Sequence, residues 1–302
     1  MAVDPFDARA KEDFNRARLR ESVVRLLSLL TNEKDSLLSL SEVKALLRPS
    51  SEVYRGMRTV PIAKIVGSEG RYLDFNRYFL PRHSHLRGRW ESVDRAHYHQ
   101  IVLPAVTLYE IGGVYFVRDG NHRVSVGRMQ KVEFIDAEVI RLESRIPMSP
   151  EMTVEDLRRA VIDLEQKAFL DETGFGRLYP QAELRFTATG RYDELVRHIN
   201  GHKYYMNLSR SDEIAFQDAL RSWYENVYRP ITRVIEEEHL LDAFPGRTVA
   251  DLYVWIVRHW DELKGKYGQA YPLRKAAVDY RERFGKGAGR RFLGFWRGFR
   301  RR

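Results

Sequence analysis

Residues 119–123, Asp-Gly-Asn-His-Arg, combine side chains and a glycine that are suited to binding an anion. They follow an apolar run typical of a buried strand and precede residues that favour a helix. The free N–H groups at the start of a helix attract anions, and Gly120 lets the main chain approach a phosphate closely. Arg123 can bind two phosphate oxygens, and His122 can donate another hydrogen bond. The pattern predicts a phosphate site formed by Gly120, Asn121, His122 and Arg123.

Three acidic residues are candidates for catalytic work beside this site. Asp119 could orient Arg123 or His122, hold a magnesium ion through water, or accept a proton. Glu69 and Asp74 follow an expected strand, and Arg71 stands between them as a further phosphate-binding candidate. An alternative interpretation makes this segment a solvated loop with local ion pairs.

The elements that must position these residues are also visible in the sequence. Residues 106–111 alternate as a strand, Gly112-Gly113 predicts a tight hairpin turn, and residues 114–117 form the returning strand. A helix is expected over 122–129 and a third strand over 132–140. Residues 58–66 predict one further, continuous strand.

In this order of hairpin, glycine-containing box, helix and strand, residues 58–141 resemble the core of the ParB/sulfiredoxin superfamily. The Asp-Gly-X-His-Arg box of the ADP-dependent serine kinases and of several ParB-like proteins matches residues 119–123. The resemblance implies a bound nucleotide (ATP, ADP or CTP), with Mg²⁺ as a further cofactor. It also implies an acid after the first strand acting as base, for which Glu69 and Asp74 are the counterparts. The stretches GRYLDFNRYFLP and FPGRTVADLYVW are similar to an uncharacterised bacterial family with no assigned activity.

Composition limits the classes of chemistry. The 302 residues include no cysteine, which excludes disulfides and thiolate catalysis and separates the chain from sulfiredoxin itself. Hydrophobic residues make up 43% and charged residues 31%, as in globular proteins. No apolar stretch approaches a membrane span, and the start of the chain does not read as a signal peptide, so a cytoplasmic location is expected.

We expect an α+β protein with four parts. These are N-terminal helices (1–50), a ParB/sulfiredoxin-like nucleotide-binding domain built on a small mixed sheet (51–147), a mostly helical domain (148–285) and a basic aromatic tail (286–302). In the helical domain, Thr153 with Asp156 and Thr248 with Asp251 predict capped helix starts. A strand is expected over 181–187, and a long helix over 212–238 with a kink at Pro230.

The net charge of +9 comes mainly from the tail. Seven Lys and Arg residues follow Gly285 without an acid, so the rest of the chain carries only +2. Arginines interleaved with aromatic residues suit single-stranded nucleic acid or an anionic membrane surface, so peripheral membrane association through the tail is also expected.

Two other segments have weaker signals. Residues 4–30 predict an amphipathic helix with Phe14, Leu19, Val23, Leu26, Leu27 and Leu30 on one side, best explained by packing on the following domain. Residues 82–100 hold two His-X-His pairs, but no nearby acid completes a ligand set, so no metal site is predicted. A substrate-covering lid or a surface helix packed through Trp90 and Tyr98 is favoured.

Two classes of function fit these patterns. The first is transfer of a phosphoryl group to a small hydroxyl-bearing substrate, with Asp119, Glu69 or Asp74 as base or metal partner. The alternative is a non-enzymatic, nucleotide-responsive DNA-binding or regulatory protein. A third interpretation is a retained fold that binds only a partner protein.

Overall fold

The computed structural model describes residues 4–31, 35–208 and 210–286 of the chain. The predicted basic aromatic tail therefore lies outside the described residues, apart from Lys286. The chain divides into two compact units, residues 1–160 and 161–302. A six-stranded mixed sheet accompanied by helices confirms the predicted α+β class.

Unit 1 contains the sheet, in the order β1-β3-β5-β4-β6-β2. Its strands are β1 (Leu38–Ser39), β2 (Glu52–Pro61), β3 (Ile65–Ser68), β4 (Val106–Ile111), β5 (Val114–Asp119) and β6 (Phe134–Leu142). β5 runs parallel to β3 and antiparallel to β4, its hairpin partner. β6 runs parallel to β4 and antiparallel to the edge strand β2. The predicted hairpin is therefore confirmed at the centre of the sheet.

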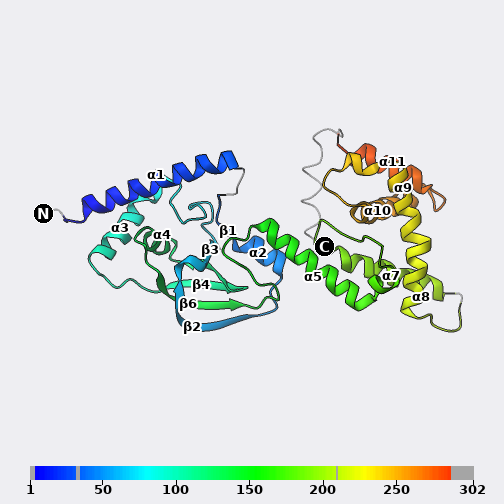
Figure 1. Ribbon diagram of the computed structural model, residues 1–302, viewed down its shortest axis with the longest axis horizontal. Helices are drawn as coiled ribbons and strands as arrows, with labels where there is room; N and C mark the ends of the chain where they lie inside the picture. The colour runs from blue at the N-terminus through cyan, green and yellow to red at the C-terminus, as the bar shows by residue number, and fades with distance from the viewer. Residues whose placement is uncertain (1–3, 32–34, 209, 287–302) are drawn as a thin grey trace. The chain divides into compact units, whose positions relative to one another are not determined.

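Three helices lie on one side of this sheet (Figure 1). They are α1 (Asp7–Thr31), α3 (Arg87–Tyr98) and α4 (Asn121–Met129), while α2 (Leu40–Leu47) follows β1. The outermost of the three, α1, packs on α3. Trp90 of α3 is fully buried and donates a 2.8 Å hydrogen bond to the hydroxyl of Ser125 on α4. Ser125 in turn donates to the carbonyl of Phe79 at 2.6 Å. This buried chain of hydrogen bonds fixes α4 between α3 and the loop that follows β3.

The strand predicted over 58–66 is broken in the structure. β2 ends at Pro61, and residues Ile62–Lys64 form a 3-10 turn before β3 begins. The guanidinium of Arg128, at the far end of α4, donates to the carbonyls of Ile62 at 3.1 Å and Ile65 at 2.6 Å. Hydrogen bonds from this distant side chain hold the carbonyls at both ends of the turn, so the prediction was wrong for a reason that local sequence does not reveal.

The described part of unit 2 is helical. Its helices are α5 (Val154–Thr173, which spans the division), α6 (Phe175–Leu178), α7 (Arg191–Asn207), α8 (Phe216–Trp223), α9 (Arg229–Glu237), α10 (Val249–Tyr267) and α11 (Leu273–Phe284). The long helix predicted over 212–238 is interrupted by a π-helical turn, Tyr224–Tyr228. Thr248 and Asp251 form the predicted capping box at the start of α10, and Thr153 and Asp156 exchange equivalent hydrogen bonds before α5.

The strand predicted over 181–187 is absent from the described residues. Leu184 and Phe186 are buried in the helical core, which explains their alternating pattern. The backbone groups of this segment form hydrogen bonds with side chains and not with a neighbouring strand. The carbonyl of Leu184 accepts from the Gln166 side chain, and the amide of Thr187 donates to the Asp251 carboxylate. Extended backbone and alternate burial can therefore occur without a sheet.

Among the described residues, no helix is both long enough and apolar enough to cross a membrane.

Candidate phosphate site at the start of helix α4

Gly120 makes the turn from β5 into α4. Its φ of 105° lies in the left-handed region, which favours glycine. A Cβ at this position would lie 2.5 Å from Cγ1 of Val106 on the adjacent strand β4. The local backbone therefore requires glycine for both conformation and space, and the first turn of α4 is held close against the sheet.

The first turn of α4 is formed by Asn121, His122 and Arg123. The first N–H groups of a helix have no acceptor within the helix, and no side chain caps this one. Together with the helix dipole, these N–H groups favour an anion beyond Gly120. The structure thus places the predicted box at the start of a helix, directly after the C-terminal end of the central strand β5.

His122 is held as a neutral donor. The ring is 8% exposed, and its Nε2 lies 2.9 Å from the guanidinium of Arg71. Because arginine only donates, Nε2 accepts and the proton sits on Nδ1. Burial, reinforced by the charges of Arg71 and Arg89, lowers the pKa of His122 to about 4. Near neutral pH His122 is therefore a fixed hydrogen-bond donor instead of a switchable one.

Two buried polar atoms in this turn have no hydrogen-bond partner. They are Nδ1 of His122 and Oδ1 of Asn121, and both residues are less than a tenth exposed. An unpaired buried polar group costs about 1–3 kcal/mol, so such groups call for an explanation. Nδ1 of His122 is a hydrogen-bond donor and Oδ1 of Asn121 is an acceptor. The pair therefore suits a ligand that carries both anionic oxygens and hydrogen-bond donors.

Arg123 and Asp119 pair with each other. The Arg123 guanidinium contacts the Asp119 carboxylate and the carbonyl of Pro104, and it donates to the carbonyl of Ala105 at 2.9 Å. Asp119 is three-quarters exposed. Arg123 therefore braces the segment before β4 in this structure, with Asp119 as the residue that orients it.

The loop after β3 brings a second group of predicted residues to the site. Arg71 contacts His122 and also pairs with Asp74, at 3.4 Å. Glu69 is exposed, and its amide donates to Val117 on β5. The structure thus brings Arg71 and Asp74 to His122, while Asp119 lies across Gly120 on Arg123. None of the contacts described for Glu69 reaches the box.

Sequence reasoning missed the residues that hold this loop in place. The Asn76 side chain, fully buried, accepts hydrogen bonds from the amides of Tyr78 and Leu80, both at 3.0 Å. Ser68 is also fully buried and accepts from the amide of Arg71 at 3.2 Å. Asn and Ser next to turns are the usual signal for such bonds, and it was present in the sequence.

The histidines of residues 82–100 do not assemble with other ligands. His83 and His85 stack at 5.4 Å between ring centroids, and both are exposed. In the described parts of the chain, no group of three or more His, Cys, Asp or Glu residues is placed to hold a metal ion. The segment forms α3, which is packed through Trp90.

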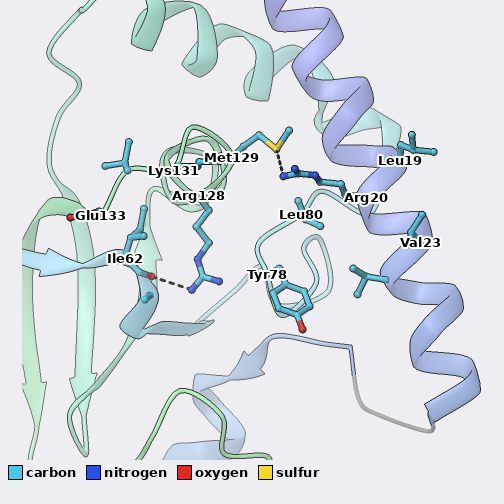
Figure 2. A pocket seen from close by; sticks show the side chains of 13 residues that line it. Leu19, Arg20, Val23, Ile62, Tyr78, Leu80, Arg128, Met129, Lys131 and Glu133 are labelled. Carbon is cyan, nitrogen blue, oxygen red and sulfur yellow. Dashed lines mark hydrogen bonds between the residues drawn. The ribbon is translucent and has the colours of Figure 1, made fainter.

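The large cavity of unit 1 lies at the other end of α4. It has a volume of about 750 Å³ and is lined by residues of α1, the loop after β3 and the C-terminal end of α4 (Figure 2). Arg128 reaches into this region from α4. Burial lowers the pKa of Arg128 to about 10, so the side chain is still charged at neutral pH. Its hydrogen bonds to backbone carbonyls give it a structural role.

Comparisons of the chain with protein-family models, with curated proteins and with solved structures give no match.

Proposed function

We propose that unit 1 binds a nucleotide, with its phosphates at the N-terminus of α4. The observation that carries this proposal is the pair of buried, unpartnered atoms, Asn121 Oδ1 and His122 Nδ1, in the first turn after a left-handed glycine. The helix N–H groups and the His122 donor suit phosphate oxygens. The Asn121 acceptor suits a hydroxyl or amino group, which inorganic phosphate at neutral pH offers poorly.

Arg71 supplies a positive charge over this turn. Its side chain is about half exposed, and it covers His122 through one hydrogen bond. The exposed part of its guanidinium can bind a phosphate oxygen while one N–H group keeps its hydrogen bond to Nε2 of His122. Arg89 of α3 adds to the positive potential and has no carboxylate partner among the described residues.

The finer form of the proposal is phosphoryl transfer to a small hydroxyl-bearing substrate. The resemblance of the box to that of the ADP-dependent serine kinases supports it. Asp119 contacts Arg123 through Oδ2, but its side chain is three-quarters exposed next to the helix start, so it is the carboxylate best placed to accept a proton or to bind Mg²⁺ through water. The side chain of Asp74, paired with Arg71, is only 24% exposed, and Glu69 begins the loop without a described contact to the box.

Thermal unfolding with ATP, ADP, CTP or inorganic phosphate, with and without Mg²⁺, tests the binding. A nucleotide at 100 times its dissociation constant should stabilise the protein by about 2.7 kcal/mol. The His122→Gln variant should lose most of this shift, whereas His202→Ala, in unit 2, should keep it. If no nucleotide shifts the wild-type protein, or if phosphate does so equally well, the proposal of a nucleotide site is wrong.

Turnover is tested separately by following ADP, AMP or CDP formation with small hydroxyl compounds. Magnesium-dependent product formation that falls in Asp119→Asn with unchanged nucleotide affinity supports the kinase form. Nucleotide binding without turnover, but with altered DNA affinity, supports the regulatory alternative instead.

A further inference from the structure

Helix α1 has two apolar faces, and only one of them is covered. Its buried side packs on α3 through Ala10, Phe14 and Ala17. Past Glu21 none of its residues is buried. Six of the large apolar side chains that follow Phe14 are instead exposed, by 67% at Leu19, 50% at Val23, 63% at Leu26, 55% at Leu27, 76% at Leu29 and 83% at Leu30.

Five of these six residues form one continuous stripe, and Leu29 lies beside it. At about 100° per residue, the five project roughly opposite to Ala10, Phe14 and Ala17. The sequence prediction that Phe14 and these leucines share one packed side was therefore wrong. We call Leu19, Val23, Leu26, Leu27 and Leu30 the outer stripe. Contiguous exposed apolar side chains of this kind mark interaction sites.

The spacing of the outer stripe fits another helix. Leu19, Val23, Leu26 and Leu30 are separated by four, three and four residues, which is the seam spacing of paired helices. From Leu19 to Thr31 the helix is about 20 Å long, enough for three turns of contact. A stripe of this length and straightness is typical of helix–helix packing.

The cavity described above begins beside the outer stripe. Leu19 and Val23 contribute to its lining, and Tyr78, Leu80 and Met129 line it from other elements. In Figure 2, Tyr78 and Leu80 lie between α4 and α1, whereas Leu19 and Val23 lie on the side of α1 turned away from them. The outer stripe is therefore open along α1 and does not face into the cavity.

The charges of α1 itself indicate that a second copy of this helix covers the outer stripe. The last turn of α1 contains no basic residue, so nothing on its own helix offsets its negative C-terminal end. Arg20, near the other end of the outer stripe, contacts only the sulfur of Met129 (3.8 Å) among the described residues. If an identical helix runs antiparallel with Leu19 opposite Leu30, Arg20 of one copy lies level with residue 29 of the other. Each copy then supplies the cation that the other lacks.

We propose that α1 pairs antiparallel with the α1 of a second copy of this chain. Leu19 packs against Leu30, and Val23 against Leu26, about a two-fold axis between Val23 and Leu26. The contact is isologous and closes at a dimer. A parallel pair would bring like arginines together and leave both C-terminal ends without a cation.

Sedimentation velocity of the full chain across a wide range of concentration tests the association. The wild-type protein should dimerise reversibly. The double variant Leu26→Glu/Leu30→Glu should remain monomeric at every concentration, with an unchanged circular dichroism spectrum because neither side chain is buried. Arg25→Glu is the matched control, since it introduces the same acid on α1 away from the outer stripe, and it should still dimerise.

Cysteine pairing tests the orientation, because the chain has no cysteine of its own. In the antiparallel pair, the two copies of residue 30 are about 16 Å apart along the axis, too far for a disulfide, whereas residue 19 meets residue 30. A mixture of Leu19→Cys and Leu30→Cys chains should therefore cross-link, and neither variant should do so alone.

Three results would overturn the proposal. The first is a wild-type protein that stays monomeric throughout. The second is cross-linking of Leu30→Cys alone without the mixed product, which would show a parallel pair. The third is a monomer that sediments with anionic vesicles and loses this property in Leu26→Glu/Leu30→Glu, which would assign the outer stripe to a membrane surface.

Discussion

The guanidinium of Arg71 donates a 2.9 Å hydrogen bond to Nε2 of His122, and this bond joins the loop after β3 to the first turn of α4. It fixes the imidazole tautomer and directs the remaining ring proton to an atom without a partner. A loop residue thereby determines what the helix start offers to a ligand.

Removing Arg71 should raise the pKa of His122. Burial is the main cause of its lowered pKa and the Arg71 charge is the second, so Arg71→Met should move the pKa only part of the way back toward 6.5. Histidine NMR titration measures this directly. Arg77→Met, in the same loop, is the control and should leave the pKa of His122 unchanged. An equal pKa in wild type and Arg71→Met would show that the contact is not maintained in solution.

Alanine at Gly120 should destabilise unit 1 by about 3 kcal/mol. The left-handed conformation costs about 1–2 kcal/mol for a residue with a Cβ, and the close contact with Val106 adds an overpacking cost of similar size. Gly190 also has a positive φ, 78°, but open space around it. Gly190→Ala should therefore cost only about 1 kcal/mol in urea unfolding. Equal losses for the two variants would contradict the packing argument.

Asparagine at Asp94 should stabilise the protein at neutral pH. Asp94 is fully buried, and burial raises its pKa to about 6. Because the pKa of Asp94 is higher in the folded than in the unfolded state, its contribution to stability is complete below about pH 4, where the carboxyl is protonated. This contribution is lost as pH rises through about 6. Asp94→Asn removes this loss, which amounts to as much as about 3 kcal/mol for two pKa units.

The pH dependence distinguishes this effect from a simple gain in packing. The benefit of Asp94→Asn should disappear below about pH 4. His122 acts in the opposite direction, because its lowered pKa contributes stability that is present above pH 6.5 and is lost as pH falls toward 4. Asp94→Asn should therefore show stability rising with pH across this window. The exposed control Asp212→Asn should match the wild-type profile, and a benefit of Asp94→Asn that is constant with pH would exclude titration as its cause.

Methionine at Arg128 should destabilise unit 1 by about 3 kcal/mol. The guanidinium satisfies the carbonyls of Ile62 and Ile65, and hydrogen bonds to a charged group contribute about 1.5–3 kcal/mol each. Urea unfolding measures the loss, with Arg25→Met as the exposed control on α1. Unchanged stability would show that water replaces these bonds.

Residues close together in the sequence were enough to predict the central hairpin and the box at 119–123. The break in the predicted strand over 58–66 depends instead on a contact between residues that are distant in the sequence. Gly112-Gly113 and the box at 119–123 specify their turns within a few residues, so their positions were predictable. The break at Ile62–Lys64 depends on Arg128, more than sixty residues away in sequence, which no local pattern reveals. Arg123 also contacts the carbonyls of Pro104 and Ala105, which come within its reach only in the fold, and its predicted role in phosphate binding stays a prediction.

The pairing of β2 with β6 has a consequence for how the protein is made. β2 occupies an edge of the sheet, and among the strands that the structure describes it pairs only with β6, residues 134–142. On a ribosome, β2 emerges long before its partner is synthesised, and loop closure over that distance delays pairing. The nascent chain must therefore hold an unpaired strand until the whole box and α4 have left the exit tunnel. A chain stalled within α4 would present that edge to chaperones.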